Sequence, residues 1–427
     1  MKYCFKTILV MIFIFSINES KANTLFNSLN SAYIKNSQLN AERAKMRATS
    51  EEKKGAISEF LPSITISGYI SEQENTNPGV DTNLRPSEQS ILVEQKLFQG
   101  FSGTANFKKK NYEEKLGKFK LKKVEQEILL AAAEAHADLI LNKKKISINV
   151  KNIDLLERQV ETDQNRLETG EINLTDLAQS EASLEGGRAK LISAQNDLVT
   201  SKANFEKVIG IKPSDDIKET VIYKIILPES LASAYNASKT ESPDLKIAQL
   251  EYEKSKLDVV IAAAELSPSA TLSYKVAEQD DFSATVKDRT QQTVTATASW
   301  PLFAGGSNFF NLQKSKELRN HKDLLLQDSR KETQTGVASA WSNYQSSKSV
   351  LDSIRSQVKA SEIANEGITL EYESGDKRTT LEVIQSRTIL LNSRIDLATS
   401  ERNFLISQFQ LLSAIGRLTG KQLNLKQ

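Results

Sequence analysis

Few residues of this chain have the types and spacings that enzymes use for catalysis. Ser50 and Lys53 have the Ser-x-x-Lys spacing of a nucleophile and its base, but neither Ser-Asp-Asn nor Lys-Thr-Gly accompanies them. His136 and His321 stand alone and the only cysteine is Cys4, so we expect both histidines on helix surfaces and no zinc site. The sequence contains no phosphate-binding loop, His-Glu-x-x-His motif or dinucleotide-binding glycine cluster. We therefore expect a protein that is not an enzyme and needs no cofactor.

The composition is typical of a helix-rich chain exposed to water. Of 427 residues, 39% are hydrophobic and 26% charged, with 17 Gly and 8 Pro, which excludes collagen, low-complexity disorder and a polytopic helical membrane protein. Lys and Arg number 56 against 54 Asp and Glu, a net charge of +2. Proteins that bind nucleic acid normally carry a net basic stripe, so no nucleic-acid partner is expected.

The first 22 residues have the pattern of an export signal. Lys2 and Lys6 form a basic start, residues 8–17 are apolar but too short to span a bilayer, and Ser-Lys-Ala at 20–22 is a small-x-small cleavage site. Cleavage would remove Cys4 and leave no possible disulfide. The pattern predicts a protein that leaves the cytoplasm; the alternative is a retained N-terminal anchor helix.

An internal duplication dominates the rest of the chain. The motif Leu-Phe-x-Gly occurs at residues 97–100 and 302–305, and a glycine follows each phenylalanine after 72 residues, at Gly170 and Gly375. Further landmarks recur at offsets of 205 to 206 residues. The sequence therefore predicts two repeats, 23–210 and 230–427, joined by a linker at 211–229.

Each repeat contains a pair of stretches with the alternating pattern of β-strands. These stretches lie at about 62–72 and 89–98 in the first repeat and at about 269–278 and 291–303 in the second. Residues 72–88 contain Asn-Pro-Gly and Arg-Pro, and are expected to form a turn-rich loop. The prediction is two hairpins with four strands in all, flanked by helices.

The longest helices are expected after the strands. No proline occurs from Gly103 to Thr169 or from Gly306 to Ser374, enough for helices of about 100 Å. Beyond each of the two glycines, apolar residues recur every seven positions: Leu177, Leu184, Leu191, Leu198 and Phe205, then Val383, Leu390, Leu397, Phe404 and Leu411. A seven-residue period is typical of left-handed coiled coils, so each glycine is expected at the tip of a long antiparallel hairpin. The alternative is a set of ordinary core helices in a globular domain.

Four strands cannot close a membrane barrel alone. An open edge leaves backbone groups without partners in lipid, and the smallest bacterial barrels have about 8 strands. Two chains would supply 8 strands and three would supply 12, and the composition does not choose between them. Such strands, continued by long helices, are expected to form a conduit. The alternative is a periplasmic coiled-coil adaptor or structural protein with no pore, which needs no lipid-facing strands.

The order of these motifs resembles that of TolC-type outer-membrane efflux proteins, the outer membrane factor family. The shared features are the duplication, Leu-Pro-Ser at residues 61–63, the Leu-Phe-x-Gly motifs and the tip glycines. The resemblance implies an α+β fold in a homotrimer, with one outer-membrane barrel of about 12 strands and a periplasmic α-barrel of coiled-coil helices about 100 Å long. It also implies outer-membrane lipid, a periplasmic adaptor and an inner-membrane transporter as partners, in efflux or type I secretion. The position of Cys4 favours the branch without a lipid anchor.

The resemblance further implies a gate at the periplasmic entrance. Thr175 and Asp176 match the family's acceptor pair, and Tyr372 matches its tyrosine donor. Lys377 or Arg378 takes the place of its arginine. An aspartate that accepts hydrogen bonds from a tyrosine and a guanidinium on neighbouring hairpins makes a breakable latch. The alternative is that these are ordinary solvated residues at helix tips.

Two more features of the entrance follow from the resemblance. Glu382 matches the first of two luminal acidic residues, whereas Gln385 stands at the second, which argues against a doubled acidic ring. The adaptor would dock at helix tips made of small or polar residues: Thr169, Gly170 and Glu171, and Ser374, Gly375 and Asp376.

Overall fold

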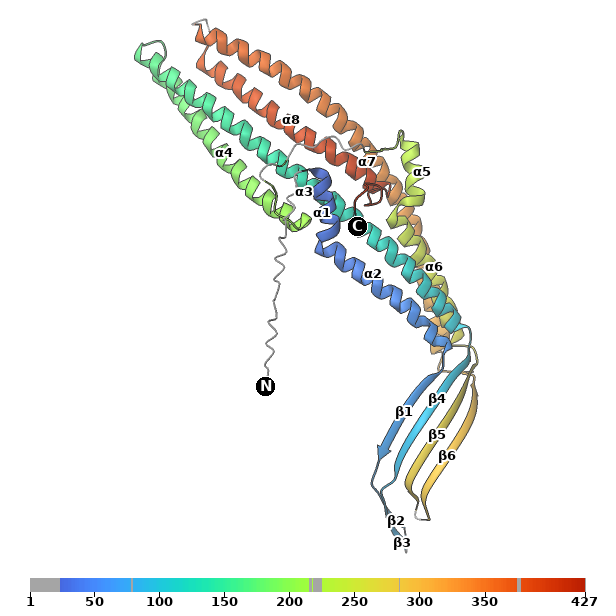
Figure 1. The fold of residues 1–427 in the computed structure, drawn as a ribbon. Helices are drawn as coiled ribbons and strands as arrows, with labels where there is room; N and C mark the ends of the chain where they lie inside the picture. Colours follow the sequence, from blue (N-terminus) through green and yellow to red (C-terminus); the bar gives the residue numbers. More distant parts are fainter. Residues whose placement is uncertain are drawn as a thin grey trace, which may run out of the picture.

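The computed structural model describes residues 24–77, 80–214, 217, 225–283, 285–374 and 378–426. The expected signal peptide and much of the expected linker lie outside these residues. The described chain is an elongated layer of helices continued at one end by a β-sheet (Figure 1). None of its helices is both long enough and apolar enough to span a bilayer.

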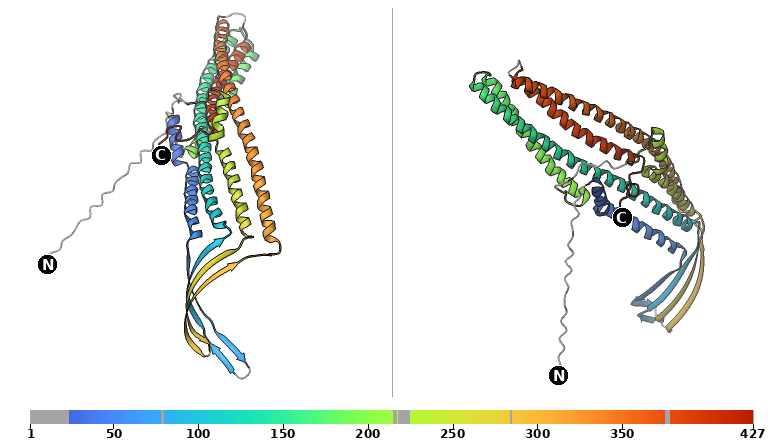
Figure 2. Two further views of the ribbon diagram at one scale, coloured as in Figure 1. Left: turned by 90° about the vertical axis from the view of Figure 1, so that its right-hand side faces the viewer. Right: turned by 45° about the horizontal axis from the view of Figure 1, so that its top comes forward.

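Four columns of secondary structure run side by side along the molecule (Figures 1 and 2). Near the sheet, each column joins one helix to one strand. The columns are α2 (Ser37–Gly55) with β1 (Ser63–Ile70), β4 (Ser87–Gln99) with α3 (Ser102–Glu168), α6 (Pro243–Ala264) with β5 (Ser269–Ser283), and β6 (Val286–Ser299) with α7 (Ser307–Glu373). In the far half, α4 (Leu174–Ile209) and α8 (Thr380–Ala414) fold back and continue the columns of α2 and α6. The helix order is therefore α2, α3, α6, α7 near the sheet and α4, α3, α8, α7 at the tips.

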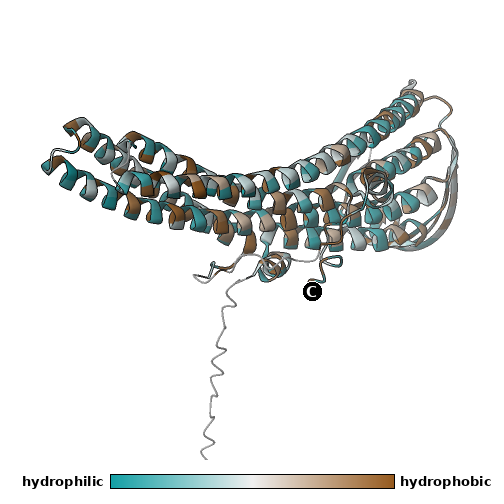
Figure 3. Cartoon of the chain, turned by 90° about the horizontal axis from the view of Figure 1, so that it is seen from above, coloured by the Kyte–Doolittle hydropathy of each residue, from teal (hydrophilic) through white to brown (hydrophobic). Residues whose placement is uncertain are grey.

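The short helices confirm the duplication. α1 (Leu25–Lys35) packs on α3, and α5 (Leu231–Glu241) packs on α7. The two long helices have the same length, 67 residues each. Seen from above, the helices form one curved layer with the C-terminus on its convex side (Figure 3). The main chain of Lys426 donates to the Asn30 side chain at 2.9 Å, so α1 lies on that side too.

The sheet is antiparallel in the order β1-β4-β5-β6. Its strands overlap the four expected stretches with shifted ends: β1 stops at Ile70, β5 extends to 15 residues, and β6 begins earlier than expected and stops at Ser299. The turn-rich loop expected at 72–88 was wrong: β2 (Gln73–Asn77) and β3 (Val80–Leu84) pair as a two-stranded ribbon, and β4 begins at Ser87. Polar residues pair in this way because the ladder bonds come from the main chain.

The two faces of the sheet differ in polarity. One row across the four strands consists of Ile64, Val93, Tyr274 and Val294. The adjacent row, which points to the other face, consists of Ser63, Glu94, Ser273 and Thr295. Ile66 is 78% exposed and Val294 70%, so the apolar face has no covering layer among the described elements. An uncovered apolar face is typical of a sheet in contact with lipid.

The expected heptads form the seams of the two helix hairpins. Every member is buried or half-buried. Three residues after the large members come small ones, all buried: Ser180, Gly187, Ala194 and Ser201 in α4, and Ser386, Ser393, Ser400 and Ser407 in α8. A Cβ on Gly187 would lie 3.0 Å from Leu156 Cδ1, which shows how closely α3 and α4 approach. Large and small residues therefore alternate along each seam.

Ion pairs link neighbouring helices in the half near the sheet. Lys53 of α2 pairs with Glu114 of α3 at 2.8 Å, and Lys109 of α3 pairs with Asp258 of α6 at 2.6 Å. The third link is Lys322 of α7 with Glu251 of α6 at 3.4 Å. These pairs connect all four columns in the half of the helical layer next to the sheet.

The hydrophobic core lies at mid-length, where α1 and the C-terminal segment cover α3 and α8. Leu29, Leu129 and Phe409 are fully buried there, and so is His136. The expectation of a surface position was therefore wrong for His136, although His321 is exposed. His136 Nδ1 lies 2.8 Å from the Ser28 hydroxyl, and burial lowers the pKa of the imidazole to about 4.

Mild acid should destabilise this core through His136. The unfolded chain binds the imidazole proton near pH 6.5 and the folded chain only near pH 4, so the free energy of unfolding falls as the pH drops through this window, by about 3 kcal/mol per chain. Unfolding midpoints of the detergent-solubilised protein between pH 7 and 4 measure the effect. The variant S28A/H136L should lose less stability with acid than the parent, whereas H321Q should behave like the parent. Equal acid sensitivity of S28A/H136L and the parent would contradict the assignment.

Candidate entrance gate

The first helix hairpin turns in a tight tip. α3 ends in a Schellman arrangement, in which the Gly170 N–H donates to the Leu167 carbonyl at 3.0 Å and the Glu171 N–H to the Arg166 carbonyl at 2.8 Å. Gly170 has φ +76°, the left-handed conformation that favours glycine. Arg166 Nε also donates to the Glu171 carboxylate at 3.0 Å. Main-chain and side-chain contacts thus fix the tip.

The returning helices of both hairpins begin with matching capping boxes. In α4, the Asn173 side chain accepts from the Asp176 N–H at 3.0 Å, and the Asp176 carboxylate accepts from the Asn173 N–H at 3.3 Å. In α8, Thr379 and Glu382 make the same two bonds at 3.3 and 2.8 Å. Such boxes satisfy backbone donors that a helix start leaves free. Asp176 and Glu382 therefore hold equivalent positions at the starts of α4 and α8.

Arg378 belongs to an exposed charge cluster of the second hairpin. Its Nε donates to Glu371 at 2.6 Å, and its Nη1 donates to Glu382 at 3.1 Å. The Thr379 N–H, and next the Arg378 guanidinium, lower the pKa of the Glu382 carboxyl. Glu382 is therefore ionised at neutral pH.

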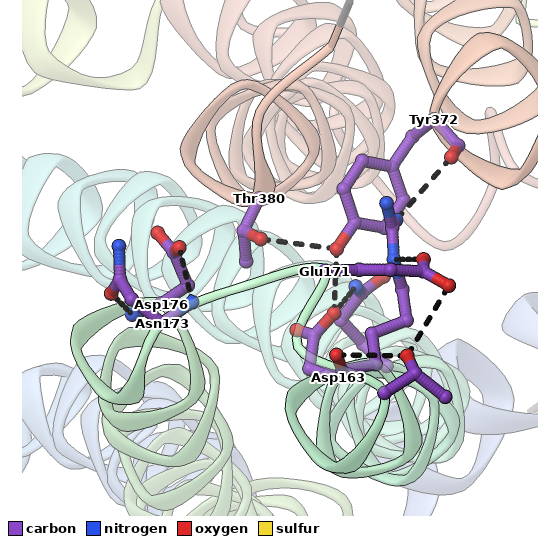
Figure 4. A network of polar contacts seen from close by, with 9 residues as sticks. Asp163, Glu171, Asn173, Asp176, Tyr372 and Thr380 are labelled. Atoms are coloured by element: carbon purple, nitrogen blue, oxygen red, sulfur yellow. Dashed lines mark hydrogen bonds and ion pairs between the residues drawn. The ribbon is translucent and has the colours of Figure 1, made fainter. Parts of the chain in front are cut away.

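A buried polar cluster joins the two hairpins next to the tips (Figure 4). Tyr372, near the end of α7, is 2% exposed, and its hydroxyl donates to Asp163 of α3 at 2.7 Å. Asp163 is fully buried and also accepts from Gln159 Nε2 at 2.8 Å and from the Ser180 hydroxyl. The Thr380 hydroxyl lies 3.0 Å from the Tyr372 oxygen and donates to it, because the Tyr372 proton is already engaged. One carboxylate therefore receives donors from α3, α4 and α7.

Arg166 completes the surroundings of Tyr372. Its guanidinium carbon lies 4.4 Å from the centroid of the Tyr372 ring, and its Nη1 donates to the Tyr372 carbonyl at 3.4 Å. Burial, with the Asp163 carboxylate as a smaller contribution, raises the pKa of the Tyr372 hydroxyl. The hydroxyl thus keeps its proton at neutral pH and stays a donor to Asp163.

The structure groups the expected gate residues differently from the predicted latch. Within one chain, Tyr372 contacts Asp163 and does not reach Asp176, whose carboxylate caps its own helix. Thr175 is exposed and makes no side-chain hydrogen bond with any described residue. Of the expected docking residues, Thr169, Gly170, Glu171 and Ser374 are exposed at the tips. Gly375, Asp376 and Lys377 lie outside the described residues.

Asp163 is the residue that reasoning from the sequence missed. Asn149, Leu156 and Asp163 are buried and seven residues apart on α3, which places Asp163 on the seam. This signal is weak because two of the three residues are polar. No group of three or more His, Cys, Asp or Glu able to hold a metal occurs in the described part of the chain.

The family model "Outer membrane efflux protein" matches the chain twice, at residues 28–211 and 234–417. The chain belongs to the outer membrane efflux protein family. The two matches also confirm the duplication. Like its family, this efflux protein is a channel of the outer membrane and not an enzyme, as the sequence predicted.

Relatives and solved structures agree with this assignment. The efflux protein is 26% identical over 406 residues to outer membrane efflux protein BepC of Brucella suis biovar 1 (strain 1330), covering 95% of this chain and 88% of BepC. It is 19% identical over 420 residues to outer membrane protein TolC of Escherichia coli (strain K12), covering 95% of this chain and 84% of TolC. Its fold is similar to that of the Campylobacter jejuni CmeC outer membrane channel, with a TM-score of 0.82 at 12% identity over 92% of this chain and 86% of CmeC.

Replacing Asp163 should loosen the tips of this efflux protein. In D163N, the new amide group faces the donors of Gln159, Ser180 and Tyr372, so at least one buried donor loses its acceptor, at a cost of about 1–3 kcal/mol. Amide hydrogen exchange should therefore accelerate at the ends of α3 and α7. The control D154N removes an exposed carboxylate of α3 that pairs with Arg158, and should leave exchange unchanged. Unchanged protection in D163N would show that the cluster does not hold the hairpins.

Proposed function

We propose that three copies of this chain form one efflux conduit, closed by a barrel of 12 strands in the outer membrane. The observation that carries the proposal is the four-stranded sheet, which has one uncovered apolar face and unpaired edges at β1 and β6. Hydrocarbon offers no partners to those edges, so β6 of one copy must pair with β1 of the next. A pore-free adaptor would have no use for such a sheet.

The helices would close into a tunnel by the same operation. α7 lies at one edge of the layer, and the column of α2 and α4 lies at the other. Joining β6 to the next β1 therefore places α7 of one copy beside α2 and α4 of its neighbour. We propose that this periplasmic tunnel receives substrate from an inner-membrane transporter through a periplasmic adaptor. The similarity to BepC, which is named an outer membrane efflux protein, favours efflux over type I secretion, the other use of such a conduit.

The adaptor contact is proposed at the helix tips. Thr169, Gly170 and Glu171 form the first tip, and Ser374, Gly375 and Asp376 are expected to form the second. A Cβ on Gly170 would meet no atom within 4 Å, so the first tip is open to a partner. Glu382 is proposed to supply one luminal acidic group per copy, which its lowered pKa keeps charged.

The closed entrance is proposed to depend on contacts within and between copies. Within a copy, Tyr372 and Asp163 join the two hairpins. Between copies, Thr175 and Asp176 at the start of the edge helix α4 would face the next copy's second tip, where Arg378 or Lys377 serves as donor. Such contacts contribute about 0.5–1.5 kcal/mol each, and their sum over three copies is comparable to the roughly 5.5 kcal/mol that separates a mostly closed from a mostly open population.

A matched pair of lysine substitutions tests the barrel. Lysine on the lipid face of a barrel costs about 2–4 kcal/mol near the bilayer centre, whereas lysine on the luminal face is tolerated. V93K should therefore abolish the heat-resistant oligomer in the outer-membrane fraction. S273K changes a residue of the adjacent row, which points to the polar face, and should retain the oligomer. Equal oligomer yields for the two variants would refute the barrel.

Opening the latch should raise conductance. Y372F/R378S removes the Tyr372 hydroxyl and the Arg378 cation, so single-channel conductance in planar bilayers should exceed that of the parent. High salt should partly mimic the double variant, because exposed charge pairs are screened. The control Y344F/R394S makes the same residue changes away from the tips and should conduct like the parent. If Y372F/R378S also conducts like the parent, these side chains are not the gate.

A further inference from the structure

Phe101 has a backbone conformation that bulky residues rarely adopt. It precedes α3 with φ +70°, directly after Gly100 with φ +58°. At the equivalent turn of the second repeat, 205 residues later, both residues are glycines, Gly305 with φ +63° and Gly306 with φ +83°. The two repeats thus share one left-handed turn, and only the first places a side chain on its second residue. A strained aromatic at a position where the other repeat has glycine points to a use for the ring.

The Phe101 ring lies on the apolar side of the sheet. Phe98 pairs with Ala270, which alternates in β5 with the polar-face residue Thr271 and therefore belongs to the apolar face. The Phe101 and Phe98 rings meet edge to face with centroids 5.4 Å apart. Phe101 is nevertheless 69% exposed. Because α3 lies between α2 and α6, a neighbouring copy joined at the sheet edges would not cover this ring.

Two lysines continue the same side of α3. Counting in sevens from Phe101, which immediately precedes α3, gives Lys108, Lys115, Lys122, Leu129 and His136. The distal pair, Leu129 and His136, is buried in the core that α1 covers, on the convex side of the layer. Lys108 and Lys115 are exposed. Lys108 has no ion pair among the described residues, and the Lys115 ammonium lies 5.4 Å from the Tyr112 ring.

The second repeat lacks this arrangement. The positions equivalent to Phe101, Lys108 and Lys115 are Gly306, Gln313 and Asn320, without an aromatic ring or a charge. Each heptad advances about 10 Å along a helix. Lys108 therefore follows the Phe101 ring at about the depth of a lipid headgroup layer. Lys115, one heptad further along, lies within the electrostatic field of the membrane surface. An apolar ring followed by cations matches the order of acyl chains and anionic phosphates at a membrane surface.

We propose that Phe101, Lys108 and Lys115 form a docking surface for anionic phospholipid. The ring enters the edge of the hydrocarbon, and the ammonium groups bind headgroup phosphates. This contact, made once per copy, would fix the depth of the sheet in the bilayer. The proposal rests on the placement of the sheet in lipid, which the V93K and S273K variants test separately. Failure of that test would contradict both the proposed barrel and the phospholipid site, whereas failure of the tests below would contradict only the phospholipid site.

The cationic part is tested with the intact oligomer in vesicles. The parent should unfold at a higher temperature in vesicles of phosphatidylcholine with phosphatidylglycerol than in phosphatidylcholine alone. K108Q/K115N, which introduces the side chains of the second repeat, should lose most of this difference. K151Q/K190Q removes two exposed charges far along the hairpin and should keep it. An undiminished difference in K108Q/K115N would overturn the cationic part.

The apolar part is tested by the depth of an introduced ring. In a W300F/W341F background, the indole created by F101W should be quenched by lipids brominated near the headgroup end of their acyl chains. F107W is the control, because Phe107 is half-buried against Phe60 with centroids 6.2 Å apart, and should be quenched much less. If F101W is quenched by aqueous iodide and not by brominated lipid, Phe101 does not enter the membrane and the proposal fails.

Discussion

Backbone groups that face hydrocarbon must find hydrogen-bond partners within the protein, and the architecture of this chain depends on that constraint. Its sheet has four strands and therefore two open edges. The helices inherit the strand order, since each column of the sheet continues as a column of the helical layer. Closure of the sheet and closure of the tunnel are thus one geometric requirement. A change that prevents β6 from pairing with β1 would open both.

The two ends of the helical layer are held by different interactions. Near the sheet, ion pairs such as Lys109 with Asp258 cross from column to column. At the tips, the hairpins are joined by a buried carboxylate with several donors and by Arg166, which contacts Tyr372. A satisfied polar cluster specifies one arrangement more strictly than apolar packing does, because any shift leaves a buried group unpaired. If the proposed gate is correct, the cluster gives the entrance one defined closed state, while the ion pairs hold the half near the sheet in shape.

Sequence periodicity predicted the parts of this fold whose residues repeat regularly. The duplication, the two 67-residue helices and the seams follow from spacings that can be counted. The ribbon of β2 and β3 was missed because its polar residues pair through the main chain, with no apolar alternation. His136 was misplaced because α1, more than 100 residues earlier, covers it. Likewise, the partner of Tyr372 depends on how two hairpins pack, and Asp163 lies 209 residues away in the chain.

The equal length of α3 and α7 limits how such a tunnel can change in size. Inserting one residue rotates everything beyond it by about 100°, which would turn a seam residue away from its partner helix. An insertion in only one of the two long helices would also carry the tip of that hairpin beyond the tip of the other hairpin. Only whole heptads, inserted in the long helices α3 and α7 and also in the returning helices α4 and α8, keep seams and tips aligned. Tunnels of this design can therefore lengthen only in steps of about 10 Å, and a duplicated chain must make each step in both repeats.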